Sequence, residues 1–235
     1  MAVDEVVTKL KSMRNPRNVE GMARFGINPK NCLGISVADL RKIARERRRD
    51  HKLALELWET GIHEARALAF LIDDKKQVTE DQMERWVRDF DSWDICDGCC
   101  LHLFGETPFA WGKAVEWAKR DDEYVKRAGY TLMAVLAVHD KKADDASFLK
   151  LLPLIKKGST DERNYVRKAV NWALRQIGKR NLALNKAAIK TGEEILALDT
   201  KASRWIARDA LRELKGEAVQ KRLRDRARRK IKEIG

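Results

Sequence analysis

The stretch that decides the fold reads Tyr165-Val-Arg-Lys-Ala-Val-Asn-Trp-Ala-Leu-Arg-Gln-Ile177. At about 100° per residue along a helix, its small and apolar residues share one narrow face, and its cations and tryptophan fall nearly opposite. The pattern therefore predicts an amphipathic helix that packs through small residues and carries a tryptophan between two cations. The packed face comprises Val166, Ala169, Ala173 and Ile177, and the opposite face comprises Lys168, Trp172 and Arg175.

An earlier stretch, Tyr124 to Leu136, follows the same plan. We expect Arg127 and Thr131 to point away from its packed face, and small residues on that face to allow close helix approach. Helix pairs stacked at a period near 40 residues are typical of HEAT-like solenoids, whose concave face forms an extended binding groove. The packed face of this stretch comprises Val125, Ala128, Leu132 and Leu136.

Five segments align on this pattern and define a column of equivalent positions. Their spacings are 31, 30, 41 and 40 residues, and their first residues are His63, Asp94, Tyr124, Tyr165 and Trp205. Equivalent positions in a repeat protein form a stripe along one surface. A basic stripe suits a polyanion, so the single carboxylate in it favours a chemical role over simple binding. The fourth residues of the segments are Arg66, Asp97, Arg127, Lys168 and Arg208.

The composition agrees with an all-α protein. Only four prolines occur in 235 residues, and long alternating β-branched runs are absent. Ser36 and Thr79 are N-cap signals, and no Gly/Ser-rich or Pro-rich linker divides the chain. We therefore predict a right-handed α-solenoid of HEAT-like repeats with a concave basic groove. It forms one domain over residues 1–235, in which 216–235 is a basic C-terminal helix or tail.

The charge points to an anionic partner. The formal net charge is +13 and the sequence pI is about 9.7, which favours nucleic acid before an anionic membrane. No apolar run approaches the roughly 18 residues of a transmembrane helix. The charged amphipathic amino terminus, residues 1–13, is unlike a secretory signal. We expect a cytoplasmic protein that binds no membrane.

The cysteines indicate reduced, buried thiols. Three of them lie within five residues of one predicted helix, which is poor geometry for a disulfide framework. Cys96 and Cys99 share a helix face near His102, but zinc sites usually require four ligands presented largely by loops. We predict no metal and no cofactor. The cysteines are Cys32, Cys96, Cys99 and Cys100.

Three motifs, in order along the chain, resemble the DNA alkylation repair family, which comprises the HEAT-like-repeat alkylpurine DNA glycosylases. The segment Gly34-Ile-Ser-Val-Ala-Asp-Leu-Arg41 is also similar to the family's early helix start, and the resemblance runs from about Met22 to Leu214. The three motifs are Asp91-Ser-Trp-Asp-Ile-Cys-Asp97, Tyr124-Val-Lys-Arg127-Ala and Lys168-Ala-Val-Asn-Trp172-Ala-Leu-Arg175.

The resemblance implies a role for each matched residue. Trp93 and Asp97 match the family's catalytic tryptophan and aspartate, and Trp172 matches its second cleft tryptophan. Arg127 matches a cleft arginine, and Arg175 matches an arginine that contacts DNA. The resemblance also implies a monomer that captures the lesion in a solvent-exposed cleft.

Two positions depart from the family's pattern. Ser92 stands where the family often has a second tryptophan, and Phe25 stands where it has a cleft tyrosine. These departures concern the substrate range and the rate more than the class of reaction.

The expected activity is excision of cationic N3- or N7-alkylated purines from duplex DNA by a monofunctional glycosylase. Asp97 would stabilise the oxocarbenium-like sugar and position water. Trp93, four residues earlier on the same helix, would project to the same side, and Trp172 would form the opposite wall. We expect phosphate contacts from Arg127, Lys168, Arg175, Arg41, Arg66 and Arg208.

Plainer alternatives exist for every candidate. Asp97 could be a surface ion-pair partner. The two tryptophans could pack between helices, and the arginines could be solvated charges. The competing functions are a noncatalytic HEAT-like nucleic-acid-binding protein, which would not need Asp97, and a protein-interaction scaffold, which would tolerate the loss of both tryptophans.

Overall fold

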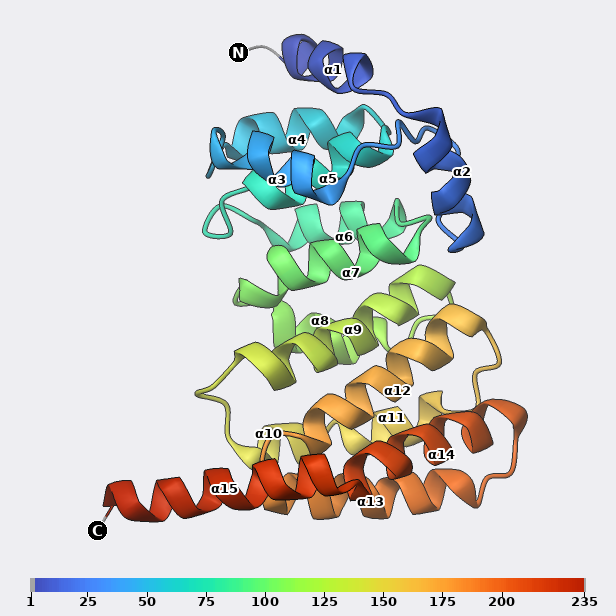
Figure 1. Cartoon of the computed structure of the whole chain (residues 1–235), viewed down its shortest axis with the longest axis vertical. Coiled ribbons are helices and arrows are strands. Elements are labelled where there is room, and N and C mark those ends of the chain that lie inside the picture. Colours follow the sequence, from blue (N-terminus) through green and yellow to red (C-terminus); the bar gives the residue numbers. More distant parts are fainter. Residues whose placement is uncertain (1–2, 235) are drawn as a thin grey trace. The chain divides into compact units, whose positions relative to one another are not determined.

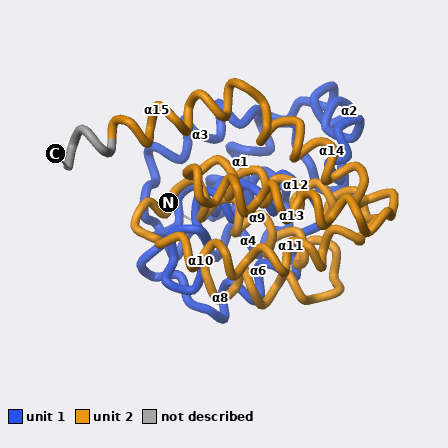
Figure 2. The backbone as a smooth tube through the Cα atoms, turned by 90° about the horizontal axis from the view of Figure 1, so that it is seen from below, with its two compact units in different colours: residues 1–110 blue, residues 111–235 orange. Residues whose placement is uncertain are grey.

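Helices form all the regular structure in the described part of the chain. The computed structural model describes the backbone of residues 3–234 and the side chains of residues 3–229. Within those residues there is no strand, which confirms the predicted all-α class. The chain divides into two compact units, residues 1–110 and 111–235 (Figure 2).

Unit 1 consists of short helices centred on α5. The helix α5 contacts α3, α4 and α7, and its Ala65, Leu68, Ala69 and Ile72 are completely buried. It is therefore the element on which α3, α4 and α7 pack. The helices are α1 (Val3–Ser12), α2 (Pro16–Arg24), α3 (Val37–Arg45), α4 (His51–Glu59), α5 (His63–Ile72), α6 (Glu80–Arg88) and α7 (Trp93–His102), followed by the 3-10 helix η1 (Phe104–Glu106).

Unit 2 contains longer helices, and α9 and α12 form its main pair (Figure 1). The helix α12 also contacts α11, α13 and α14, so it is central to this unit. Its helices are α8 (Ala110–Trp117), which begins at the unit boundary, α9 (Glu123–His139), α10 (Asp145–Leu149), α11 (Leu152–Gly158), α12 (Asn164–Gly178), α13 (Leu182–Leu196), α14 (Lys201–Lys215) and α15 (Glu217–Ile234).

The two predicted N-cap residues, Ser36 and Thr79, cap α3 and α6. The Ser36 hydroxyl accepts the amide of Asp39 at 3.2 Å, and the Thr79 hydroxyl accepts that of Gln82 at 3.1 Å. Each satisfies one of the amides that the first helical turn leaves without an intrahelical partner. Residues 217–234 form α15, so the basic C-terminal segment is helical.

The two faces predicted for α12 are confirmed. All four residues of its small, apolar face are completely buried, whereas Trp172 and Arg175 are half-buried and Lys168 is exposed. The helix therefore packs through small side chains on one side and presents a tryptophan and cations on the other, as its periodicity indicates.

The corresponding expectation for α9 is wrong. Arg127 is only 5% exposed and Thr131 is completely buried, so neither points away from the packed interior. The reason is that α9 has neighbours on more than one side. A Cβ atom on Gly129 would lie 2.3 Å from the backbone nitrogen of Ala118, just after α8, and α12 also packs against α9. A helix surrounded in this way is buried all round.

Two neighbouring pairs of the repeated segments meet at their first residues, one pair in each unit. The first residues of two neighbouring segments in unit 1, His63 and Asp94, are hydrogen-bonded at 2.9 Å. Their counterparts in unit 2, Tyr124 and Tyr165, stack with ring centroids 5.7 Å apart. The stacking of the remaining segments into one column stays a prediction.

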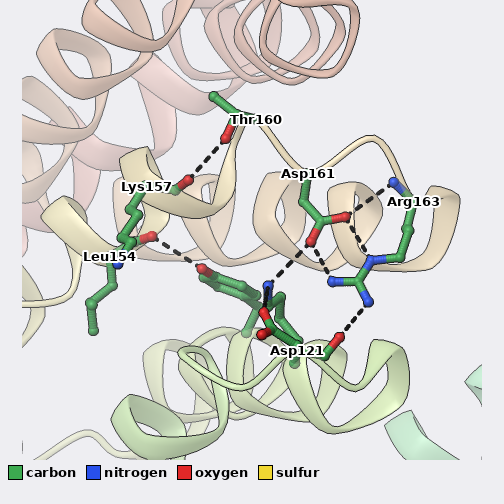
Figure 3. A network of polar contacts seen from close by, with 8 residues as sticks. Asp121, Leu154, Lys157, Thr160, Asp161 and Arg163 are labelled. Carbon is green, nitrogen blue, oxygen red and sulfur yellow. Dashed lines mark hydrogen bonds and ion pairs between the residues drawn. The ribbon is translucent and has the colours of Figure 1, made fainter.

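A polar network fixes the loop before α12 to the loop before α9 (Figure 3). The Arg163 guanidinium donates to the Asp161 carboxylate through Nε at 2.9 Å and Nη2 at 2.6 Å, and also to the Asp121 carbonyl. Lys126 lies 3.4 Å from the same carboxylate. Burial opposes the charge of Asp161, but the hydrogen bonds from Arg163 hold its pKa below the ordinary value.

Replacing Asp161 by Asn should lower the free energy of unfolding at pH 7 by about 1 kcal/mol, since the ion pair is partly open to solvent. Because the pKa is lowered in the folded protein, this stabilisation is present above the ordinary aspartate pKa of 3.8 and is lost as the pH falls through the folded value. Urea unfolding at pH 7 and pH 3 should show the difference between the two proteins shrinking in acid. The neighbouring, exposed Asp122, changed to Asn, is the control; an equal effect there would contradict the assignment.

Candidate nucleic-acid interface

The start of α7 carries two of the residues predicted to act in catalysis. Trp93 is the first residue of the helix and Asp97 follows one turn later, so both project from the same side. Both side chains are half-buried. The Trp93 indole donates a hydrogen bond of 3.0 Å to the Phe25 carbonyl at the end of α2, which fixes the orientation of its ring.

The loop after α2 is tied to α7 by further hydrogen bonds. The amide of Asn28 donates to the Ser92 hydroxyl at 3.0 Å, and its side-chain nitrogen donates to Asp91 at 2.7 Å. Ser92 is completely buried, whereas the Phe25 ring is 77% exposed. The two departures from the family's pattern therefore meet at one place. A tryptophan at 92 would have no room and no acceptor for the Asn28 amide.

A buried carboxylate organises the continuation of this loop. Glu64 is 1% exposed and accepts the amides of Leu33 at 2.7 Å, Gly34 at 2.6 Å and Ile35 at 3.3 Å. Gly34 has a φ of +80°, and a Cβ atom there would lie 2.2 Å from the Asn15 carbonyl oxygen. Only glycine allows this approach, so the loop conformation depends on both residues.

His63 forms a buried ion pair below the same loop. Its Nε2 lies 2.9 Å from Asp94, and only 8% of the residue is exposed. Burial opposes the charge, but hydrogen bonds to Asp94 and Cys32 raise the pKa of His63 to about 10. Sequence reasoning missed this cluster. A signal was present, because Cys32, His63 and Asp94 follow one another at intervals of 31 residues, the spacing of the first two repeated segments.

An apolar hollow of about 600 Å³ adjoins Trp93 in unit 1. Its walls come from α2, α3, α5 and α7 and include Phe25, Val37, Phe70 and Trp93. Phe25 and Val37 are unusually exposed for apolar residues, at 77% and 59%. An aromatic surface on this side of Trp93 is thus open to solvent.

Unit 2 places its candidate residues on α9, α12 and α14. The buried Arg127 donates from Nη1 to the Tyr165 carbonyl at 2.6 Å, which joins α9 to the first turn of α12. Trp172 is half-buried, with the exposed Lys168 one turn before it. Arg208 is exposed on α14.

Arg175 takes part in ion pairs between α12 and α14. Its Nη1 lies 2.5 Å from Glu213, and its Nε lies 3.8 Å from Asp209. Lys179 contacts the other Glu213 oxygen at 2.7 Å. Burial opposes the charge of Glu213, but hydrogen bonds from Lys179 and Arg175 hold its pKa below the ordinary value. Arg175 can therefore reach a phosphate only by sharing its charge with Glu213.

Of the two predicted DNA-contacting arginines in unit 1, Arg66 is engaged with neighbouring residues and Arg41 is open to solvent. Arg66 donates to the Asp89 carbonyl at 3.0 Å, and its guanidinium lies 5.2 Å from the centroid of the Trp58 ring. Arg41 is exposed on α3. Of the predicted DNA-contacting residues, Arg41, Lys168 and Arg208 are thus open to solvent, whereas Arg66, Arg127 and Arg175 are engaged within their units.

The structure brings Trp93 and Asp97 together within unit 1, and Lys168, Trp172 and Arg175 together on one helix of unit 2. Joint action of the two sets stays a prediction.

Three further properties of the described residues bear on function. No group of three or more His, Cys, Asp or Glu side chains among them could hold a metal ion. None of the helices they form has the length and apolar character needed to cross a membrane. The four cysteines are buried free thiols, and burial raises the pKa of Cys99 well above its ordinary value.

The raised pKa of His63 predicts a loss of stability in alkali. The stabilisation that the ion pair of His63 with Asp94 contributes is fully present below the ordinary histidine pKa of 6.5, and it is lost as the pH rises through about 10. The free energy of unfolding of the wild type should therefore fall more steeply between pH 6.5 and pH 10 than that of His63→Gln. The exposed His139, changed to Gln, should keep the wild-type slope. Equal slopes in all three proteins would show that the ion pair contributes nothing.

Comparisons with known proteins match the chain to a family model, to two bacterial relatives and to a solved structure. The family model described as "DNA alkylation repair enzyme" matches residues 6–214. An uncharacterised protein of Listeria innocua serovar 6a is 23% identical over 196 residues, which cover 82% of this chain and 85% of the relative. An uncharacterised protein of Listeria monocytogenes serovar 1/2a is 22% identical over the same shares of the two chains.

A solved structure shares the fold with a TM-score of 0.74, at 21% identity and covering 83% of each chain. It is described as one of a new family of proteins related to the HEAT-like repeat DNA glycosylases, with affinity for branched DNA structures. The predicted HEAT-like architecture is thereby confirmed. Because the family model matches most of the length of this chain, the chain belongs to the DNA alkylation repair enzyme family.

Proposed function

We propose that this protein is a monofunctional DNA N-glycosylase that excises cationic N3- or N7-alkylated purines from duplex DNA. The observation that carries the proposal is the pair at the start of α7. Trp93 and Asp97 lie one turn apart, and the indole ring is held in place by the Phe25 carbonyl. An aromatic face beside a carboxylate suits a cationic base and a sugar that becomes cationic.

The proposed reaction needs little from the protein at the leaving group. An alkylated purine already carries a positive charge, so the bond between C1′ and the base nitrogen breaks with its electrons passing to the base. Asp97 would stabilise the positive charge left on the sugar and orient a water. The water oxygen then bonds to C1′, and its proton passes to Asp97 or to solvent.

The aromatic residues would hold the lesion by its faces. The ring of Trp93 is fixed by its hydrogen bond to the Phe25 carbonyl. The ring of Phe25, at the end of α2, is exposed. Trp172 contributes a third, half-buried ring from unit 2. Stacking of a base on such rings is worth about 1–3 kcal/mol each, and a cationic base adds cation–π attraction.

The exposed cations would hold the DNA backbone. Arg41, Lys168 and Arg208 are open to solvent and free to release counterions from phosphates. Arg66, Arg127 and Arg175 would serve mainly to shape the units that present them, because their guanidinium groups already bind Asp89, Tyr165 and Glu213. We propose that the protein acts on duplex DNA as a monomer.

A second candidate is a noncatalytic DNA-binding protein. The solved relative with affinity for branched DNA structures favours this alternative. Such a protein would prefer a four-way junction to a duplex and would release no base.

Changing Asp97 to Asn tests the proposed chemistry. On duplex DNA containing N7-methylguanine, excision should fall by about 100-fold or more, because the charge that stabilises the transition state is lost. Affinity for the same DNA should be unchanged or higher, since a carboxylate repels phosphate. Released base is measured by chromatography and affinity by fluorescence anisotropy.

The control is Asp81→Asn, which removes an exposed carboxylate from α6 of the same unit. Equal excision by wild type and the Asp97 variant would refute catalysis by Asp97. Absence of excision by the wild type, together with preference for a four-way junction, would establish the second candidate.

A double-mutant cycle tests whether the two units act on one nucleotide. Trp93→Ala and Trp172→Ala should each slow excision, and the double variant should depart from additivity, because residues that hold one transition state are coupled. Rates under single-turnover conditions provide the measurement. Trp205, 39% exposed on α14, gives the control pair with Trp93, for which additive effects are expected. Additivity in both cycles would mean that Trp172 does not act at the lesion.

A further inference from the structure

A polar hollow of about 470 Å³ in unit 2 has no part in the chemistry described above. It lies where α9 and α12 end and where α15 passes them, and it is lined by residues 137, 138, 141, 176, 179–181, 222 and 226. Of the nine described residues that line it, five are cations, two carry amides, and none is a carboxylate. The composition of the wall is that of an anion-binding site.

Three of the cations are held in place by the protein. Arg180 donates to the carbonyls of Ala137 at 2.8 Å and Ala143 at 3.2 Å, and its guanidinium stacks 4.1 Å from the centroid of the Phe148 ring. Lys141 donates to the Val138 carbonyl, and Lys179 is paired with Glu213. These contacts satisfy the end of α9 and make one side of the hollow rigid.

The nearest carboxylates behind Arg180 have partners of their own. Asp140 accepts the indole of Trp111 at 3.0 Å, and Asp145 accepts the side chain of Asn181 at 2.7 Å. Both still attract Arg180, yet burial dominates and lowers the pKa of its guanidinium. The positive charge is thus only partly compensated from within the protein.

The remaining two cations are not compensated by described residues. Arg222 and Arg226 are exposed and four residues apart on α15, so they share one face. Across residues 3–229, whose side chains are described, neither guanidinium lies within ion-pair distance of a carboxylate. Their charge is available to an anion outside the protein.

The hollow continues the face of α12 that carries Trp172. Gln176 and Lys179 follow Trp172 by four and seven residues, which places all three side chains within about 60° of one another around the helix axis. The first lining residue, Gln176, is reached after a rise of about 6 Å along the helix. A nucleic acid strand held at Trp172 would therefore meet the hollow next.

We propose that this hollow binds a backbone phosphate of the DNA strand that flanks the nucleotide at Trp172, with Arg222 and Arg226 as its principal ligands. The inference rests on the proposed function for the identity of the polyanion. It adds a contact from α15, which lies beyond the residues 6–214 that the family model matches.

The test compares two double variants of α15 that carry the same change of charge. Arg222→Ala/Arg226→Ala removes the cations of the hollow. Arg224→Ala/Arg228→Ala removes two exposed cations on the opposite face of the same helix. Affinity for undamaged duplex DNA is measured by fluorescence anisotropy at a series of salt concentrations, and circular dichroism confirms that both variants keep the helical fold.

The 222/226 variant should bind more weakly, and the slope of log K against log salt should become shallower by about 1 for each guanidinium removed. The 224/228 variant should stay close to the wild-type slope. Equal slopes in the two variants would overturn the proposal. Affinity for poly-glutamate is measured in the same way. If the 222/226 variant loses that affinity but binds DNA as tightly as the wild type, the proposal is also overturned, and the hollow is a site for acidic protein segments.

Failure of the proposed function gives a different result. Wild-type protein would then release no base, whereas the salt slopes on undamaged duplex would still decide whether the hollow binds phosphate.

Discussion

Burial of backbone amides in the segment between α2 and α3 is the constraint on which the arrangement of Trp93 and Asp97 at the start of α7 depends. Three consecutive amides, at residues 33–35, turn inward, and an amide left unpaired there would cost about 1–3 kcal/mol. Glu64, at the centre of unit 1, accepts all three. By holding residues 33–35, the Glu64 carboxylate positions the segment that precedes them. That segment contains the Phe25 carbonyl and the Asn28 amide, the two groups that hold the start of α7.

The same segment explains why two departures from the family's pattern occur together. Ser92 is small and buried and supplies an acceptor to Asn28, which brings the end of α2 against α7. With α2 in that position, Phe25 presents its ring to solvent beside Trp93. A tyrosine hydroxyl is not needed to hold this loop, because the backbone of residue 25 already binds the indole.

The cations divide into those that build the units and those that face solvent. Arg66, Arg127 and Arg180 donate to carbonyl groups of neighbouring elements, and Arg175 and Lys179 neutralise Glu213. Arginine suits the first task because its planar donors reach two acceptors at once. The net charge of +13 therefore does not measure the charge that is open to an anionic ligand, because part of it is already neutralised or engaged within the units.

The sequence by itself determined the all-α class, the capped starts of α3 and α6, the two faces of α12 and the pairing of Trp93 with Asp97 on one helix turn. All of these depend on residues within a few positions of one another, whose relations follow from helix geometry. The burial of Arg127, the ion pair of His63 with Asp94 and the engagement of Arg175 with Glu213 were decided only by the tertiary structure. Periodicity identifies the apolar face of one helix, but it does not state how many neighbours that helix has. Partners 31 and 38 residues apart meet only when successive helices stack, and the stacking sets which charges are neutralised and which remain for a ligand.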